Sequence, residues 1–175
     1  MKKKMTKVIL KVFLIIFLSG NLFASDIKDD DYKFEITLPS GWSEPKIQEA
    51  EKKDAISYSI NRFDEKSAIL ILAFKVNNIK DLTDFVWTIE KDVTLNIPQK
   101  DSEVYLKFDE GYYDGMQMFY SDDNFRESIY YFRTKYTDTN SNFAYVVRFI
   151  TPKDALSEKM KTEIKEIADS FKPVQ

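Results

Sequence analysis

The sequence predicts an α+β fold: a central antiparallel sheet with helices on both faces, which is an α/β/α sandwich. Residues 68–76 and 143–150 are apolar at almost every position, so both strands should be covered on both faces. Short turns rich in Asp, Asn and Gly separate the later strands, which is typical of an antiparallel meander. Two segments with helical spacing, 81–96 and 151–171, supply the covering layers.

The first half of the chain predicts three strands. From Tyr32 to Leu38, apolar residues alternate with polar ones, which indicates a half-buried strand, and a turn should bring Trp42 back over it. Residues 44–54 have no consistent period, and an irregular strand, a loop or a short helix all fit. Residues 55–63 alternate again and join the apolar run 68–76 through a polar turn, so we expect a hairpin.

A helix is expected over residues 81–96, because its apolar residues form one stripe. Asn77, Asn78 or Asp81 can cap its start. Trp87 lies off this stripe, at its boundary or on the surface. The stripe consists of Leu82, Phe85, Val86, Ile89 and Val93.

Four strands and a closing helix are expected in the second half, with the strands over 104–108, 115–121, 128–137 and 143–150. Arg148 interrupts an apolar strand and needs a carboxylate partner or a route to water. For Arg126, Arg133 and Arg148, which all lie in or near the late strands, pairing with a carboxylate is favoured over anion binding. Thr151 is expected to cap the closing helix, with Pro152 in its first position.

An export signal is expected at the start of the chain. Residues 1–24 combine five lysines and no acidic residue with an apolar stretch and then small residues, which is the order of a secretory signal peptide cleaved after Ala24. A retained N-terminal anchor and a buried helix are the alternatives, although the apolar stretch falls short of the ~20 residues that span a bilayer. We therefore expect a signal peptide over 1–24, an acidic linker over 25–31 and one domain over 32–175. The protein should be periplasmic or secreted, without a membrane span after cleavage.

Composition excludes several kinds of site. The chain has no cysteine and no histidine, so disulfides, Ser-His-Asp triads, Cys-His pairs and ordinary zinc sites are excluded. Residues 25–175 carry 21 basic and 29 acidic side chains, which argues against a nucleic-acid partner. Residues 138–142 carry oxygen ligands at alternate positions, but Phe143 and Phe149 stand where a calcium loop needs Gly and an acid. We expect no metal site and no cofactor.

Three short segments carry a resemblance to a known family. They are FEITLPSGW at 34–42, the amphipathic helix that begins near Asp81, and IADSFKP at 167–173. Together they resemble the PsbP-like family, which includes the DcrB-type bacterial periplasmic proteins. The resemblance implies an α/β/α sandwich, and it assigns no site residue.

The main functional hypothesis is an exported, non-enzymatic binding or accessory protein that contacts another protein of the bacterial cell envelope. Trp87, Tyr112 and Tyr113 are the aromatic residues least easily assigned to a core, so they are the candidate contact residues. The alternative is a small-ligand or cation-binding carrier, which requires a largely apolar pocket of ~300 Å³ or more between sheet and helix. A hydrolase that works through two carboxylates is the third hypothesis, and no catalytic residue is assigned.

Overall fold

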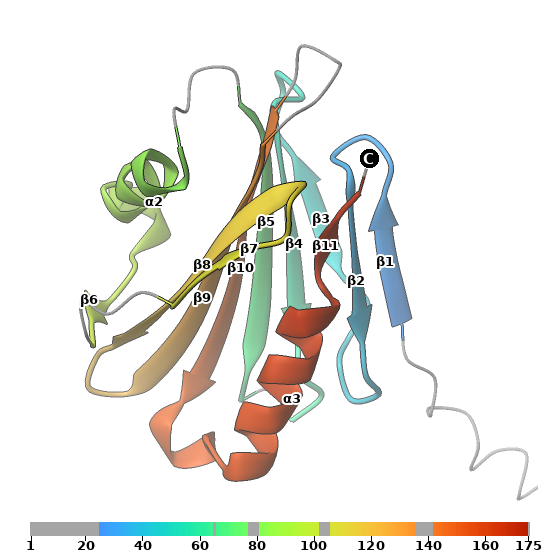
Figure 1. The fold of residues 1–175 in the computed structure, drawn as a ribbon. Coiled ribbons are helices and arrows are strands. Elements are labelled where there is room, and N and C mark those ends of the chain that lie inside the picture. The colour runs from blue at the N-terminus through green and yellow to red at the C-terminus, as the bar shows by residue number, and fades with distance from the viewer. Residues whose placement is uncertain (1–24, 65, 77–80, 102–105, 136–141, 175) are drawn as a thin grey trace, which may run out of the picture.

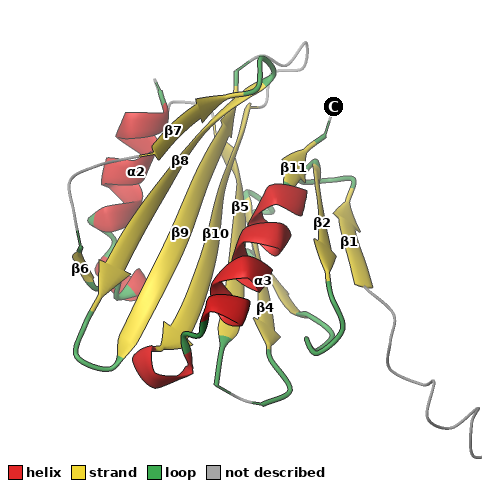
Figure 2. Ribbon diagram, turned by 60° about the horizontal axis from the view of Figure 1, so that its bottom comes forward, coloured by secondary structure: helices red, strands yellow, loops and turns green. Residues whose placement is uncertain are grey.

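The computed structural model describes residues 25–64, 66–76, 81–101, 106–135 and 142–174, which form two antiparallel sheets and two α-helices (Figures 1 and 2). The expected signal peptide lies outside these residues. The smaller sheet has three strands in the order β1-β2-β11. Its strands are β1 (Ser25–Asp29), β2 (Phe34–Leu38) and β11 (Lys172–Pro173).

The larger sheet has eight strands in the order β3-β4-β5-β10-β9-β8-β6, with β7 also paired to β8. Its central strand β10 lies between β5 and β9, as its apolar residues on both faces require. The strands are β3 (Lys46–Glu49), β4 (Ala55–Asn61), β5 (Ala68–Val76), β6 (Gln99–Lys100), β7 (Leu106–Asp109), β8 (Tyr113–Ser121), β9 (Phe125–Thr134) and β10 (Asn142–Pro152).

Helix α2 (Leu82–Glu90) is capped by Asp81, whose carboxylate accepts a hydrogen bond of 2.9 Å from the backbone N–H of Asp84. The helix is shorter than predicted. The chain turns at Asp92 into the 3₁₀ segment η1 (Val93–Leu95), which leaves Val93 89% exposed instead of buried.

A second 3₁₀ segment, η2 (Lys153–Ala155), precedes helix α3 (Glu158–Ser170). In the described part of the chain, neither helix reaches the length and hydropathy that a bilayer crossing needs.

The alternating residues of β10 belong to two cores. Phe143, Tyr145, Val147 and Phe149 pack on the side of β2 and α3. Ala144 and Val146 pack on the opposite side, beneath the apolar stripe of α2. The prediction that this strand is buried on both faces is therefore confirmed.

The predicted α/β/α sandwich, a central antiparallel sheet with helices on both faces, is wrong. The molecule is mostly β, and a second sheet packs beside α3 on one face of the large sheet (Figure 1). The Phe34 ring of β2 meets Tyr58 of β4 with 5.4 Å between ring centroids and Tyr145 of β10 with 6.0 Å. These contacts join two sheets face to face.

The sequence did not predict the second sheet, because the two strands that pair with β2, β1 and β11, are short and mostly polar. Ser25–Asp29, expected as a linker, forms β1, in which only Ile27 is buried. The Asp29 carboxylate accepts hydrogen bonds from the Tyr58 hydroxyl (2.5 Å) and the backbone N–H of Tyr32 (2.8 Å), so this acidic segment belongs to the fold.

Candidate functional site

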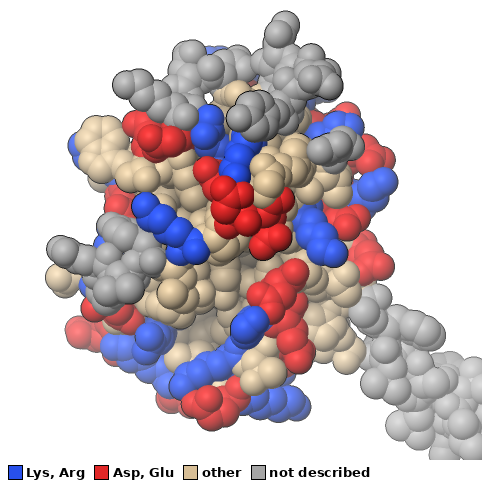
Figure 3. All heavy atoms as spheres, in the orientation of Figure 1, with Lys and Arg blue, Asp and Glu red and all other residues tan. Residues whose placement is uncertain are grey.

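A cleft of about 910 Å³ lies between the large sheet and α3. Helix α3 and the small sheet lie over one half of the large sheet, and β7, β8 and the outer part of β9 extend beyond them (Figure 2). The space-filling view shows an uncharged hollow at the centre of this face, bordered by charged side chains (Figure 3). Because no other element of the described chain fills this half, the sheet face and α3 become the two walls of the cleft.

The strand register arranges the cleft-facing residues of the sheet in rows. Side chains alternate between the two faces, and every second residue of β8, β9 and β10 faces α3. From one end to the other, the rows are Arg126–Thr151, Phe119–Ser128–Phe149, Gln117–Tyr130 and Gly115–Phe132. The cleft is therefore polar at the Arg126 end and aromatic at the Phe132 end.

The aromatic end is a cluster of rings from three strands and from Phe171, the residue that follows α3. Phe132 of β9 lies 4.6 Å from Phe171, 5.7 Å from Phe108 of β7 and 6.0 Å from Tyr113 of β8, all measured between ring centroids. Phe132 and Phe171 are almost completely buried, so they form the base of the cleft. Such a surface favours apolar ligands, because apolar area leaves water when they bind.

Gly115 allows Phe108 to lie against the sheet. Phe108 and Gly115 are directly opposite each other in the β7–β8 pair. A Cβ atom at position 115 would overlap the Phe108 ring. The missing side chain of Gly115 therefore positions one aromatic wall of the cleft.

We expect Gly115→Ala to displace the Phe108 ring and to lower the free energy of unfolding by about 1–3 kcal/mol, the usual cost of overpacking. Urea unfolding of the variant measures this cost. In a Phe108→Ala background the ring is absent, so adding Gly115→Ala should cost almost nothing. An equal cost in both backgrounds would contradict the role of Gly115 proposed here.

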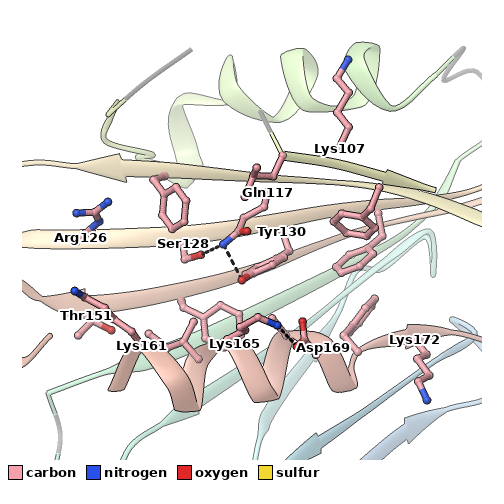
Figure 4. A pocket seen from close by; sticks show the side chains of 18 of the residues that line it. Lys107, Gln117, Arg126, Ser128, Tyr130, Thr151, Lys161, Lys165, Asp169 and Lys172 are labelled. Atoms are coloured by element: carbon pink, nitrogen blue, oxygen red, sulfur yellow. Dashed lines mark hydrogen bonds and ion pairs between the residues drawn. The ribbon is translucent and has the colours of Figure 1, made fainter. Parts of the chain in front are cut away.

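A hydrogen-bonded polar group lies in the middle of the cleft (Figure 4). The Gln117 side-chain amide donates to the Tyr130 hydroxyl at 2.7 Å and to the Ser128 hydroxyl at 3.2 Å. Burial raises the pKa of Tyr130 above its usual value, so this hydroxyl keeps its proton at neutral pH. A hydroxyl that accepts one hydrogen bond can still donate one, so Ser128 and Tyr130 offer two donors to a ligand.

Thr151 lies in the wall of the cleft and not at a helix start, which corrects the sequence prediction. It belongs to β10, and Ser157 caps α3 instead, accepting from the backbone N–H of Met160 at 3.2 Å. The Thr151 hydroxyl is buried and has no hydrogen-bond partner within the described part of the chain. A buried polar atom without a partner costs free energy unless a ligand or water satisfies it.

Cationic side chains surround the cleft. Arg126 pairs with Asp101 at 3.5 Å and lies over the Phe119 ring, 5.3 Å from its centroid. Lys161 and Lys165 line the α3 wall. Lys107 and Lys172 also belong to the lining, but Figure 4 shows their ammonium groups pointing away from the cavity.

The three candidate contact residues do not come together. Trp87 lies on α2, on the other side of the large sheet, and is 57% exposed with the Lys91 ammonium over its ring. Tyr113 lines the cleft, and the Tyr112 hydroxyl donates to the backbone oxygen of Val174 at 3.0 Å. Their contact with a protein partner stays a prediction.

Metal binding has no support in the described part of the chain, where no three acidic side chains converge on a site for an ion. The two acids in the lining of the cleft are Glu110 and Asp169, and Asp169 is paired with Lys165. The cleft therefore presents cations and hydroxyl groups to a ligand rather than a set of carboxylates.

The sequence-based searches give no relatives: no family model and no curated protein matches the chain. Solved structures are similar in fold. The Ran-binding protein Mog1p from Saccharomyces cerevisiae is 11% identical, with a TM-score of 0.50 over 88% of this chain and 97% of that chain. A mutant of Mog1 is 12% identical, with a TM-score of 0.50 over 87% of this chain and 97% of that chain.

LpqN of Mycobacterium tuberculosis, described as involved in cell envelope biogenesis, is 12% identical, with a TM-score of 0.49 over 87% of this chain and 91% of that chain. At these identities the similarities concern the fold alone. The chain has a fold of the Mog1p/PsbP-like type, and membership of the PsbP-like family itself stays a prediction.

Proposed function

We propose that this chain is a non-enzymatic binding protein that takes a small, largely apolar ligand into the cleft between β7–β9 and α3. One observation carries the proposal: a mostly apolar cavity of about 910 Å³ with a few converging polar groups. Small-molecule sites have this size and character, at ~300–1,000 Å³. The geometry thus favours the carrier that the sequence offered as the alternative, and contact with another envelope protein stays a prediction.

The chemistry of the cleft supports binding rather than catalysis. The chain has no histidine or cysteine, and the two hydroxyls at the centre of the cleft are held by Gln117, an amide that cannot accept their protons. Asp169 is engaged by Lys165. A nucleophile and a base in mutual contact, the usual requirement for covalent catalysis, have no counterpart among these contacts.

The start of the sequence supports a location outside the cytosol. The lysine-rich and then apolar residues 1–24 have the order of a cleaved export signal. The proposed carrier therefore works in the periplasm or outside the cell.

Binding of a neutral apolar dye, Nile red, tests the proposed function. Nile red fluorescence should rise on addition of the purified protein, with a dissociation constant in the micromolar range, about −8 kcal/mol. Ser128→Phe places a ring in the middle of the cavity and should weaken binding at least about tenfold, because it occupies the volume that the dye needs. Ser59→Phe makes the same change at an exposed position of β4 and should leave binding unchanged.

Circular dichroism spectra of both variants check that they fold. Equal dye binding by wild type and a folded Ser128→Phe variant would place the dye outside the cleft. That result would overturn the proposed function.

A further inference from the structure

We infer that the ligand is an anionic amphiphile, a single apolar chain that ends in a carboxylate. Its head group lies at the Arg126–Thr151 end of the cleft and its tail on the rings around Phe132. The inference rests on the proposed function, because it names the class of ligand for the same cleft.

The charges of the cleft differ from those of the whole domain. Residues 25–175 have an excess of acidic side chains. The two acidic residues in the lining of the cleft, Glu110 and Asp169, lie toward its aromatic end, and Asp169 is paired with Lys165. Among the described residues, the polar end has cations and no acidic lining residue, so charge complementarity favours an anionic head group there.

Two cations lie at the polar end. Arg126 is the cross-strand neighbour of Thr151, and Lys161 extends from α3 toward the same end of the cavity (Figure 4). Arg126 pairs with Asp101 at 3.5 Å, and Lys161 pairs with Glu158 at 2.6 Å. Both pairs reach solvent, and pairs of this kind contribute about 0–1 kcal/mol, so a carboxylate can replace them at little cost.

Hydroxyl donors complete the polar end. The Thr151 hydroxyl is buried without a partner in the described part of the chain, and the adjacent row of the sheet supplies Ser128. Tyr130 lies one row further along, in the middle of the cleft, and does not belong to this end. A carboxylate accepts hydrogen bonds through two oxygens, so it can accept from the hydroxyl groups of Thr151 and Ser128. A neutral hydrocarbon would leave them without an acceptor.

The distance between the two ends suits an amphiphile. Arg126 and Phe132 lie on the same strand, six residues apart, which corresponds to ~20 Å at ~3.3 Å per residue. Between the two ends lie Phe119, Tyr130 and Phe149, with Leu156 and Ile164 on the opposite wall. An acyl chain that starts at Arg126 therefore passes the polar group of Gln117 and Tyr130 and contacts these apolar side chains on its way to Phe132.

Dodecanoate and dodecanol, which share a tail and differ in the head group, separate this inference from the proposed function. Displacement of Nile red should show dodecanoate binding at least about tenfold more tightly than dodecanol, because a charge-assisted contact is stronger than a neutral one. The double variant Arg126→Gln/Lys161→Gln should weaken dodecanoate about tenfold and leave dodecanol unchanged. Thr151→Val removes only the hydroxyl and should weaken dodecanoate about threefold.

Lys159→Gln is the matched control, because Lys159 is an exposed lysine of α3, like Lys161, but does not line the cleft. It should change neither affinity. Equal affinities of the wild-type protein for the two amphiphiles would overturn the inference and leave the proposed function standing. Failure of both amphiphiles and of Nile red to bind would overturn the proposed function as well. A double variant that binds dodecanoate as tightly as wild type would refute the assigned position of the head group.

Discussion

Glu127→Ala should lower the free energy of unfolding by about 3–5 kcal/mol, the usual cost of leaving a buried charge without its partner. Glu127 is 3% exposed, and its carboxylate accepts two hydrogen bonds from Arg148, from Nε at 2.5 Å and from Nη2 at 2.7 Å. Arg148 Nη1 also donates to the backbone oxygen of Leu95 at 2.6 Å. Removing the carboxylate leaves a buried guanidinium with backbone oxygens as its remaining partners among the described residues.

Urea unfolding monitored by circular dichroism measures this loss. Lys28→Ala is the matched control, because it breaks an ion pair of 3.0 Å with Asp30 in which both side chains are mostly exposed. Its cost should stay below about 1 kcal/mol. Similar costs for Glu127→Ala and Lys28→Ala would contradict the burial of the Glu127–Arg148 pair.

Phe171→Ala is expected to cost about 3–5 kcal/mol of stability, as is usual when a buried aromatic side chain is truncated. The Phe171 ring is 2% exposed and stacks on Phe34 of the small sheet, with 5.6 Å between centroids. It also lies 4.6 Å from Phe132 and 5.4 Å from Tyr145 of the large sheet, again between centroids. One side chain thus joins both sheets, and its loss leaves a cavity between them.

The same unfolding assay applies, with Phe63→Ala as control. Phe63 is 64% exposed, so its truncation should change stability by less than about 0.5 kcal/mol. A conservative Phe171→Leu change keeps part of the contact and should cost less than Phe171→Ala. If Phe171→Ala costs no more than Phe63→Ala, the packing of the small sheet against the large one is wrong.

Most of the strands of the large sheet were predictable from local patterns. The apolar run 68–76 is β5, and Asp81 caps α2 as one of three candidates. The need of Arg148 for a carboxylate was also clear, because a charge between apolar neighbours must be paired, and Glu127 supplies the partner. These features depend on periodicity and burial, which a short window of sequence contains.

The cleft was not predictable from such windows. Gln117, Ser128, Tyr130 and Thr151 come from three strands and meet only through the register between those strands. The sequence contains one local sign of the cleft: Arg126, Ser128 and Tyr130, at every second position of β9, lie on the same face of that strand and carry polar groups. The local sequence predicts Thr151 as a helix cap because Pro152 follows it, but the pairing of β10 with β9 places Thr151 in a strand instead.

The sequence by itself determined the absence of thiol and imidazole chemistry and a domain built around β10, a strand buried on both faces, while the export signal over residues 1–24 stays a prediction. Only the tertiary structure decided that a second sheet packs beside α3 on the same face of the large sheet. It also decided that β7–β9 extend beyond α3 and the second sheet. The physical reason is that composition and periodicity are properties of neighbours in the chain. Register, sheet pairing and the space left between two layers depend instead on contacts between residues far apart in the sequence.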